Sequence, residues 1–201
     1  MTRIWPLIAF LLGMTSAWAG ASTQPEMKPL SAAEAERRVT ETRDFLVGLL
    51  WEHTDVHWHA GRWDEAIRLC HQVIELDPGF VEAYTGAAWL LWSMDRDEEA
   101  IEFYRAGAAA NPDSYEIPHE FGMYYHYRHK WGQAAEQFRK AVELQAPSYL
   151  QHMLPNVLER AGKKREALAE WRALSKRFPN DPIPRRHIEA LVAELEGEQQ
   201  P

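Results

Sequence analysis

The sequence contains one cysteine among its 201 residues, Cys70, so no internal disulfide can form. It has fewer bases than acids: 22 Lys and Arg against 30 Asp and Glu give a formal net charge of −8 at pH 7. That balance argues against nucleic acid or anionic lipid as a partner, because both are bound through Lys and Arg. The sequence also lacks the enzyme patterns that were sought: a nucleophile beside a base, a phosphate-gripping glycine loop and an H-E-x-x-H helix. No segment alternates apolar and polar residues with a period of two, so no sheet is expected.

The first residues carry the marks of an export signal. Residues 1–3 bring one positive charge, residues 4–12 are apolar, and Ala17-Trp18-Ala19 has the small-x-small pattern that signal peptidase reads. We expect residues 1–19 to be a cleaved signal peptide and the mature chain to be exported, either periplasmic or secreted. The alternative is an uncleaved membrane anchor, but the apolar run is short for a permanent span. Residues 20–30 are rich in small and polar residues and proline, which is typical of a flexible linker.

A short pattern of alanine, a large or apolar residue four positions later, and then proline recurs along the rest of the chain. Its copies are Ala66-x3-Cys70 with Pro78, Ala100-x3-Tyr104 with Pro112, Ala134-x3-Phe138 with Pro147, and a shifted Ala167-x3-Trp171 with Pro179. The first three alanines lie 34 residues apart. A fixed period of this length indicates stacked helix pairs, none of which can bury its apolar face alone.

Local signals place the helix ends. Ser31 and Glu34 fit a capping box, and Gly61 is a typical helix terminator. Proline ends the second helix of each pair, because it has no N–H to donate. Ile188, Leu191, Val192 and Leu195 form the apolar side of a last helix that would cap the array. The expected helices cover residues 31 to about 59, 63–76, 80–94, 98–110, 115–129, 133–145, 150–160, 165–178 and a segment within 182–197.

Together with Gly61-Arg-Trp-Asp-Glu-Ala66-Ile67, this repeat makes residues 47–181 resemble the tetratricopeptide repeat family. The family's first-helix positions correspond here to Leu50, His53, Thr54 and His57; Tyr84, Ala87, Ala88 and Leu91; Pro118, Phe121, Gly122 and Tyr125. The resemblance implies an all-α fold: a right-handed superhelical solenoid of antiparallel helix pairs with flanking N- and C-terminal helices. It also implies a non-catalytic adaptor that binds another protein, here in the cell envelope or secretory space, with no cofactor.

The expected division of the chain follows from the repeat boundaries. It comprises the signal peptide 1–19, the linker 20–30, an N-terminal helix 31–46 leading into the array, four repeats (47–80, 81–114, 115–147, 148–181), a capping helix 182–197 and a tail 198–201.

The fourth repeat departs most from the family pattern. Pro147 falls one residue late, and Pro155 lies inside a first helix, where it loses the bond to Gln151 and should bend the helix at a cost of about 3 kcal/mol. In the first repeat, the family positions at His53, Thr54 and His57 are polar where apolar or small residues are usual.

In this family, partners usually lie in a concave groove lined by the first helices. Stepping along the non-packing side of each first helix predicts the groove residues Trp51, Asp55, Trp58 and His59; Thr85, Trp89 and Trp92; His119, Met123, His126 and Tyr127; His152, Asn156 and Glu159. So many aromatic side chains suit an extended peptide or an apolar helix face. Alternatively, the N-terminal helix or neighbouring repeats cover the rings. Given the net charge, the partner should be apolar or basic rather than acidic.

Two alternatives remain open at this point. His53 and His57 stand at i, i+4, and the family pattern places Cys70 opposite them, so zinc or copper could be bound. Ordinary packing of these three side chains is the competing interpretation. The aromatic face could also bring two copies of the chain together.

Overall fold

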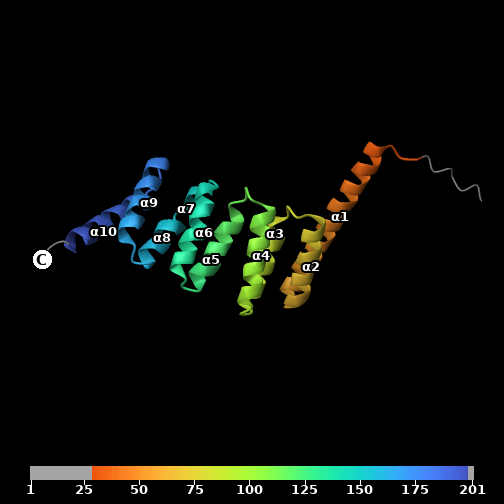
Figure 1. The fold of residues 1–201 in the computed structure, drawn as a ribbon, viewed down its shortest axis with the longest axis horizontal. Helices are drawn as coiled ribbons and strands as arrows, with labels where there is room; N and C mark the ends of the chain where they lie inside the picture. Colours follow the sequence, from red (N-terminus) through yellow and green to blue (C-terminus); the bar gives the residue numbers. More distant parts are fainter. Residues whose placement is uncertain (1–28, 199–201) are drawn as a thin grey trace, which may run out of the picture. The chain divides into compact units, whose positions relative to one another are not determined.

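The structure, a computed structural model, describes residues 29–198, which form helices and no strand. The helices of this range are α1 Ala32–His59, α2 Trp63–Leu76, α3 Val81–Ser93, α4 Asp97–Ala110, α5 Glu116–Tyr127, α6 Trp131–Glu143, α7 Ser148–Gln151, α8 Met153–Arg160, α9 Lys164–Arg177 and α10 Ile183–Gly197 (Figure 1). The expected signal peptide, most of the linker and the last three residues lie outside the described residues. Within the described range, no helix is both long and apolar enough to cross a membrane.

The chain divides within α1 into two units, one up to Thr40 and one from Glu41 onward. The repeats and every site discussed below belong to the second unit. In that unit α3 packs on α4, α5 on α6, and α8 on α9, so consecutive helices form hairpins. Each second helix also packs on the following first helix, since α2 contacts α3, α4 contacts α5 and α6 contacts α8. This is the connectivity of a helical solenoid.

The helix ends follow the local signals in the sequence. The Ser31 hydroxyl accepts the Glu34 backbone N–H at 3.2 Å, as a capping box requires. Gly61 has φ +69, a left-handed conformation that favours glycine, and α1 ends two residues before it. Pro78 and Pro112 directly follow the C-cap residues of α2 and α4, so these prolines lie at junctions as predicted.

The recurring alanines and the residues four positions after them form the spine of the core. No member of this set is more than 1% exposed: Ala66, Ala100, Ala134, Ala167, Cys70, Tyr104, Phe138 and Trp171. The alanines let neighbouring helices approach closely, and the larger side chains fill the space beside them. Fully burying one such large apolar side chain contributes about 2 kcal/mol.

The fourth repeat is irregular in the way that Pro155 predicts. Its first helix is broken into α7 and α8 at His152, because Pro155 has no N–H to offer the Gln151 carbonyl. The side chain of Gln151 is buried and bonds to two partners. Its amide nitrogen donates to the Ala146 carbonyl, and its amide oxygen accepts from Arg177 at 2.8 Å. The break therefore changes which side of the segment faces the core.

The packing side of α1 differs from the prediction. Thr54 is buried and its hydroxyl donates to the Leu50 carbonyl at 2.9 Å, but His53 is exposed and so does not pack. His57 is half-buried, and its Nδ1 accepts from Arg62 Nε at 2.9 Å. The reason is that α1 turns Trp51 and other larger side chains toward the core, leaving His53 on the outer side.

Candidate functional site

A groove lies between α1 and α3, with a volume of about 730 Å³. We call it the α1–α3 groove; its lining residues are Trp51, Glu52, Thr54, Asp55, Val56 and Trp58 from α1, and Glu82, Thr85 and Gly86 from α3. Four of the predicted groove residues, Trp51, Asp55, Trp58 and Thr85, are among them. A cavity of this size is in the range that binds small ligands or a short stretch of peptide.

The floor of the groove is aromatic. The Trp51 ring lies 5.0 Å from Phe80, and the half-buried Trp58 stacks on Trp89 at 5.0 Å. Gly86 lies beneath both α1 indoles, since a methyl group there would sit 3.9 Å from Trp51 and from Trp58. A larger side chain at Gly86 would therefore reduce the open space above α3.

Three carboxylates surround this aromatic floor. Asp55 pairs with His59 at 3.3 Å, and both side chains are exposed. Glu52 and Glu82 make no side-chain hydrogen bond or ion pair with other described residues. Carboxylates beside indole faces favour a cation, because the ring quadrupole and the negative charges attract it together.

A row of rings continues from this groove along the ends of the first helices. We define the aromatic row as Trp58, Trp89, Trp92, Tyr127, His126 and Trp131. Consecutive ring centroids lie 5.0, 5.9, 5.5, 5.8 and 5.3 Å apart. The rings partly cover one another, which agrees with the interpretation that neighbouring repeats shield them. Trp89 nevertheless keeps 42% of its surface exposed and Tyr127 57%, so the row presents apolar area to solvent.

The two ends of the aromatic row carry opposite charges. Glu52, Asp55 and Glu82 flank its α1 end. At the far end, the Arg160 guanidinium lies 5.6 Å from the Trp131 ring centroid. A segment bound along the row would meet negative charge first and positive charge last.

The α5 predictions are partly wrong. His119 is buried and packs against Phe138 at 5.7 Å, so it does not face the groove. The reason is Gly122, which lets Phe138 of α6 approach this side of α5. Met123 is half-buried against the core, whereas His126 and Tyr127 join the aromatic row.

The α7–α8 predictions are also mostly wrong. His152 is buried, with its Nε2 2.7 Å from Asp181. Glu159 turns toward α9 and α10: it accepts from Trp171 Nε1 at 2.6 Å and lies 3.0 Å from His187 Nδ1. Asn156 is half-buried and donates to the His152 carbonyl at 2.8 Å. The break at His152 shifts the helical phase, so stepping from the array's register points to the wrong side.

The metal alternative at His53, His57 and Cys70 does not fit the structure. No group of three His, Cys, Asp or Glu that could hold a metal ion occurs within residues 29–198. His53 faces outward, whereas Cys70 is in the core. Burial raises the pKa of the Cys70 thiol to about 12.

Sequence reasoning missed five residues that line the α1–α3 groove: Glu52, Thr54, Val56, Glu82 and Gly86. Each lies one residue or one turn from a predicted groove residue: Glu52 precedes Asp55 by three positions, and Glu82 precedes Thr85 by three. Stepping one turn further toward the start of α3 would have found Glu82, and taking the i−3 as well as the i−4 neighbour of Asp55 would have found Glu52.

Comparison with known proteins agrees with the architecture. The tetratricopeptide repeat family model matches residues 57–117. No curated protein sequence matches the chain. Similar solved structures include PilF of Pseudomonas aeruginosa, at 16% identity over 78% of this chain and 72% of that one, with a TM-score of 0.58. MamA is 18% identical over 71% and 84% of the two chains, with a TM-score of 0.56, and YrrB is 17% identical over 75% and 78%, with a TM-score of 0.54.

These structures and the helix connectivity define the class. The fold is the all-α solenoid of tetratricopeptide repeat proteins. At these identities the likeness concerns the fold, and the partner must be argued from the residues of this chain.

Proposed function

We propose that the chain is a non-catalytic adaptor that holds a segment of a partner protein in the α1–α3 groove and along the aromatic row. The observation that carries the proposal is a groove of about 730 Å³ in which two indoles form the floor and three carboxylates the rim. YrrB, which shares the fold, is described as having an unusual peptide-binding site. Peptide binding therefore occurs within this architecture.

The partner segment is both basic and apolar. Apolar side chains would cover the exposed parts of Trp89 and Tyr127, at about 25 cal/mol for each Å² removed from water. A Lys or Arg at the α1 end would meet Glu52, Asp55 and Glu82 over the Trp58 ring. Because these carboxylates lie at the surface, salt should weaken the binding.

The proposal includes export of the mature chain. Its support is the pattern of residues 1–19, with one base, an apolar run and Ala17-Trp18-Ala19. Sequencing the N-terminus of the protein purified from its native cells tests this. A mature chain that begins at Gly20 is expected, and a chain that retains Met1 would contradict export by cleavage.

Selection from a displayed library of linear peptides on the purified chain tests the binding proposal. We expect selected peptides to combine Lys or Arg with aromatic or aliphatic residues. The triple variant Glu52→Gln, Asp55→Asn, Glu82→Gln should bind them about tenfold more weakly or worse, which corresponds to a loss of about 1.4 kcal/mol. Trp89→Ala should weaken binding as well, because Trp89 is the most exposed indole of the row.

A matched variant controls for net charge. Glu75→Gln, Glu98→Gln and Glu189→Gln remove three exposed carboxylates that lie away from the α1–α3 groove. This control should bind the selected peptides as the wild type does. Equal losses in both triple variants would reduce the effect to general electrostatics. A selection in which no Lys- or Arg-containing peptide binds more weakly to the Glu52→Gln, Asp55→Asn, Glu82→Gln variant would contradict the proposal.

A further inference from the structure

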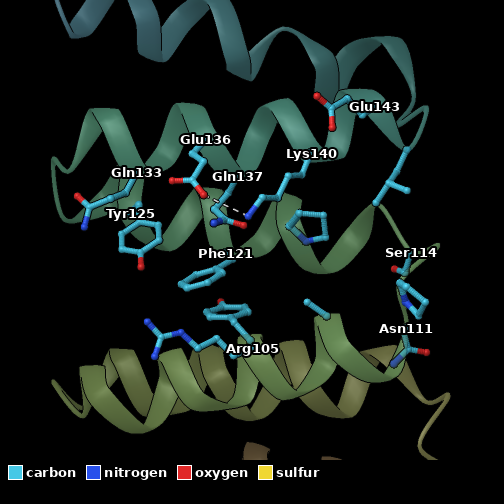
Figure 2. A pocket seen from close by; sticks show the side chains of 15 residues that line it. Arg105, Asn111, Ser114, Phe121, Tyr125, Gln133, Glu136, Gln137, Lys140 and Glu143 are labelled. Carbon is cyan, nitrogen blue, oxygen red and sulfur yellow. Dashed lines mark hydrogen bonds and ion pairs between the residues drawn. The ribbon is translucent and has the colours of Figure 1, made fainter.

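A second cavity, of about 680 Å³, lies between α4 and α6 above α5. We call it the α4–α6 groove. Figure 2 shows its two walls and the side chains between them: Arg105 comes from the α4 wall, Phe121 and Tyr125 from the floor, and Gln133 and Gln137 from the α6 wall. None of the predicted groove residues lines it, because it lies between two second helices of the repeats.

The floor of the α4–α6 groove is a stack of three rings. Tyr104 and Phe121 lie 4.8 Å apart with 14° between their planes. Phe121 and Tyr125 lie 4.7 Å apart at 26°. Tyr104 is only 1% exposed, Phe121 6% and Tyr125 8%, so an apolar side chain of a partner would contact the exposed edges of Phe121 and Tyr125.

The repeats provide an internal comparison for this groove. The equivalent space between α2 and α4 has only about 190 Å³. There Phe103 packs against His71 at a ring distance of 4.5 Å, and Ile74 lines the same space. One repeat of 34 residues later, Gln137 stands at the position of Phe103 and Ala108 at that of Ile74. The groove is open because two large apolar side chains are replaced there by a polar one and a small one.

The walls of the groove offer unused hydrogen-bonding groups. The Gln133 and Gln137 amides make no side-chain hydrogen bond with any residue of the described range, and each has two donors and an acceptor oxygen. A bound helix could not use them fully, because its backbone groups are already paired. An extended segment presents free N–H and C=O groups along its length, so amide-lined walls favour an extended segment.

The charged residues of the α4–α6 groove favour one orientation of a bound extended segment. Lys140 already pairs with Glu136 at 3.2 Å. Arg105 makes no ion pair with the rest of the described chain, and Figure 2 shows it at the end of the groove near Tyr125 and Gln133. Glu143 lies toward the opposite end, on the side of Asn111 and Ser114. A carboxylate of a ligand is therefore attracted to the Arg105 end and disfavoured at the other.

We propose that the α4–α6 groove is a second binding site, which takes an extended segment of another protein with an apolar side chain against the exposed edges of Phe121 and Tyr125 and an Asp or Glu at Arg105. The site is separate from the α1–α3 groove and has the opposite charge preference. The chain thereby joins two partners, one basic and one acidic at the point of contact.

A positional-scanning library of acetylated, amidated hexapeptides tests this site on the full chain, with binding measured by fluorescence polarisation. Among the hexapeptides whose binding does not depend on Glu52, Asp55 and Glu82, Asp or Glu and one aromatic or aliphatic residue should be preferred at a fixed spacing. Ala108→Ile and Gln137→Phe each restore the side-chain type found one repeat earlier, so both should fold and weaken binding about tenfold or more. Arg105→Ala should remove the acidic preference and retain the apolar one.

Two controls keep the outcomes distinct. Ala106→Ile places the same bulk on α4 toward the α2–α4 space, and Trp89→Ala alters only the aromatic row; both should bind the hexapeptides as the wild type does. Unchanged hexapeptide binding by Ala108→Ile and Gln137→Phe would overturn the proposal, as would a loss in these two variants that is confined to basic hexapeptides. A wild-type dimer that Ala108→Ile converts to a monomer would show that the groove holds a second copy instead.

Discussion

Arg128 links the second and third repeats through hydrogen bonds to three residues. Its Nη2 atom donates to the Trp92 carbonyl at 2.9 Å, to Asp97 at 2.6 Å and to Asp95 at 3.1 Å. The bonds to Asp97 are the main reason that the pKa of Arg128 is raised. Arg128 and Asp97 are both partly shielded from water, so this ion pair is screened less than one on the open surface.

Replacing Arg128 should therefore destabilise the array. We expect Arg128→Ala to lower the free energy of unfolding by about 2 kcal/mol, because hydrogen bonds to charged groups are lost. Arg105→Ala is the matched control, since Arg105 makes no ion pair within residues 29–198, and it should change stability by less than about 0.5 kcal/mol. Urea denaturation measures both. Similar losses in the two variants would contradict the role given to Arg128.

His126 makes stability depend on pH. Burial lowers its pKa, and the positive charges of Arg160 and His129 lower it further. The unfolded chain, with the ordinary value of 6.5, therefore binds a proton before the folded chain does. Stability should be unaffected by this group above that value and should fall as the pH drops below it.

The comparison of wild type with His126→Phe isolates this effect. Between pH 7 and pH 5 the melting temperature of the wild type should fall further than that of the variant, because the variant has no group at position 126 to protonate. Thermal unfolding followed by circular dichroism gives both values. Parallel falls in the two proteins would show that His126 does not contribute.

At the scale of elements, the α5–α6 hairpin depends on Gly122. A methyl group at Gly122 would lie 2.7 Å from two carbons of the Phe138 ring. We expect Gly122→Ala to destabilise the protein by about 1–3 kcal/mol, because the buried Phe138 cannot move away freely. In α6, Gly132 has open space around its α-carbon, so Gly132→Ala should instead stabilise by about 0.5 kcal/mol. A stability gain in Gly122→Ala, measured by chemical denaturation, would contradict this packing.

The bounds of the helices could be predicted from the sequence better than the side of each helix that faces solvent. α2 runs from Trp63 to Leu76 as predicted, because proline and glycine mark helix ends locally. The sides on which His119 and His152 lie could not be read from helical periodicity. Phe138 of α6 packs over α5 at Gly122, which buries His119. Pro155 breaks the first helix of the fourth repeat, which changes the side on which His152 lies. Periodicity extended across such a break points to the wrong side.

The α1–α3 groove could be predicted from the sequence more readily than the α4–α6 groove. Tryptophans in the first helices indicated the α1–α3 groove. The α4–α6 groove depends on what is missing, since Ala108 and Gln137 stand where an earlier repeat has Ile74 and Phe103. Such a difference is visible only when the repeats are aligned and their burial is known.

For the whole molecule, the net charge of −8 averages over surfaces of unlike character. The α1–α3 groove gathers carboxylates around indoles, whereas the α4–α6 groove has at one end the guanidinium of Arg105, which makes no ion pair within residues 29–198. The net charge predicts an apolar or basic partner. That prediction suits the carboxylates of the α1–α3 groove and does not extend to the α4–α6 groove. Partner chemistry is thus a property of each groove rather than of the chain.

Photo-cross-linking in the native cell tests the central claim most directly, namely that the α1–α3 groove holds a partner protein. A benzophenone amino acid placed at Thr85, in the groove, should cross-link to a protein segment that carries Lys or Arg beside apolar residues. The same group at Gln72, exposed on α2, should not capture that segment. Capture of the segment from both positions, or from Gln72 alone, would contradict the account.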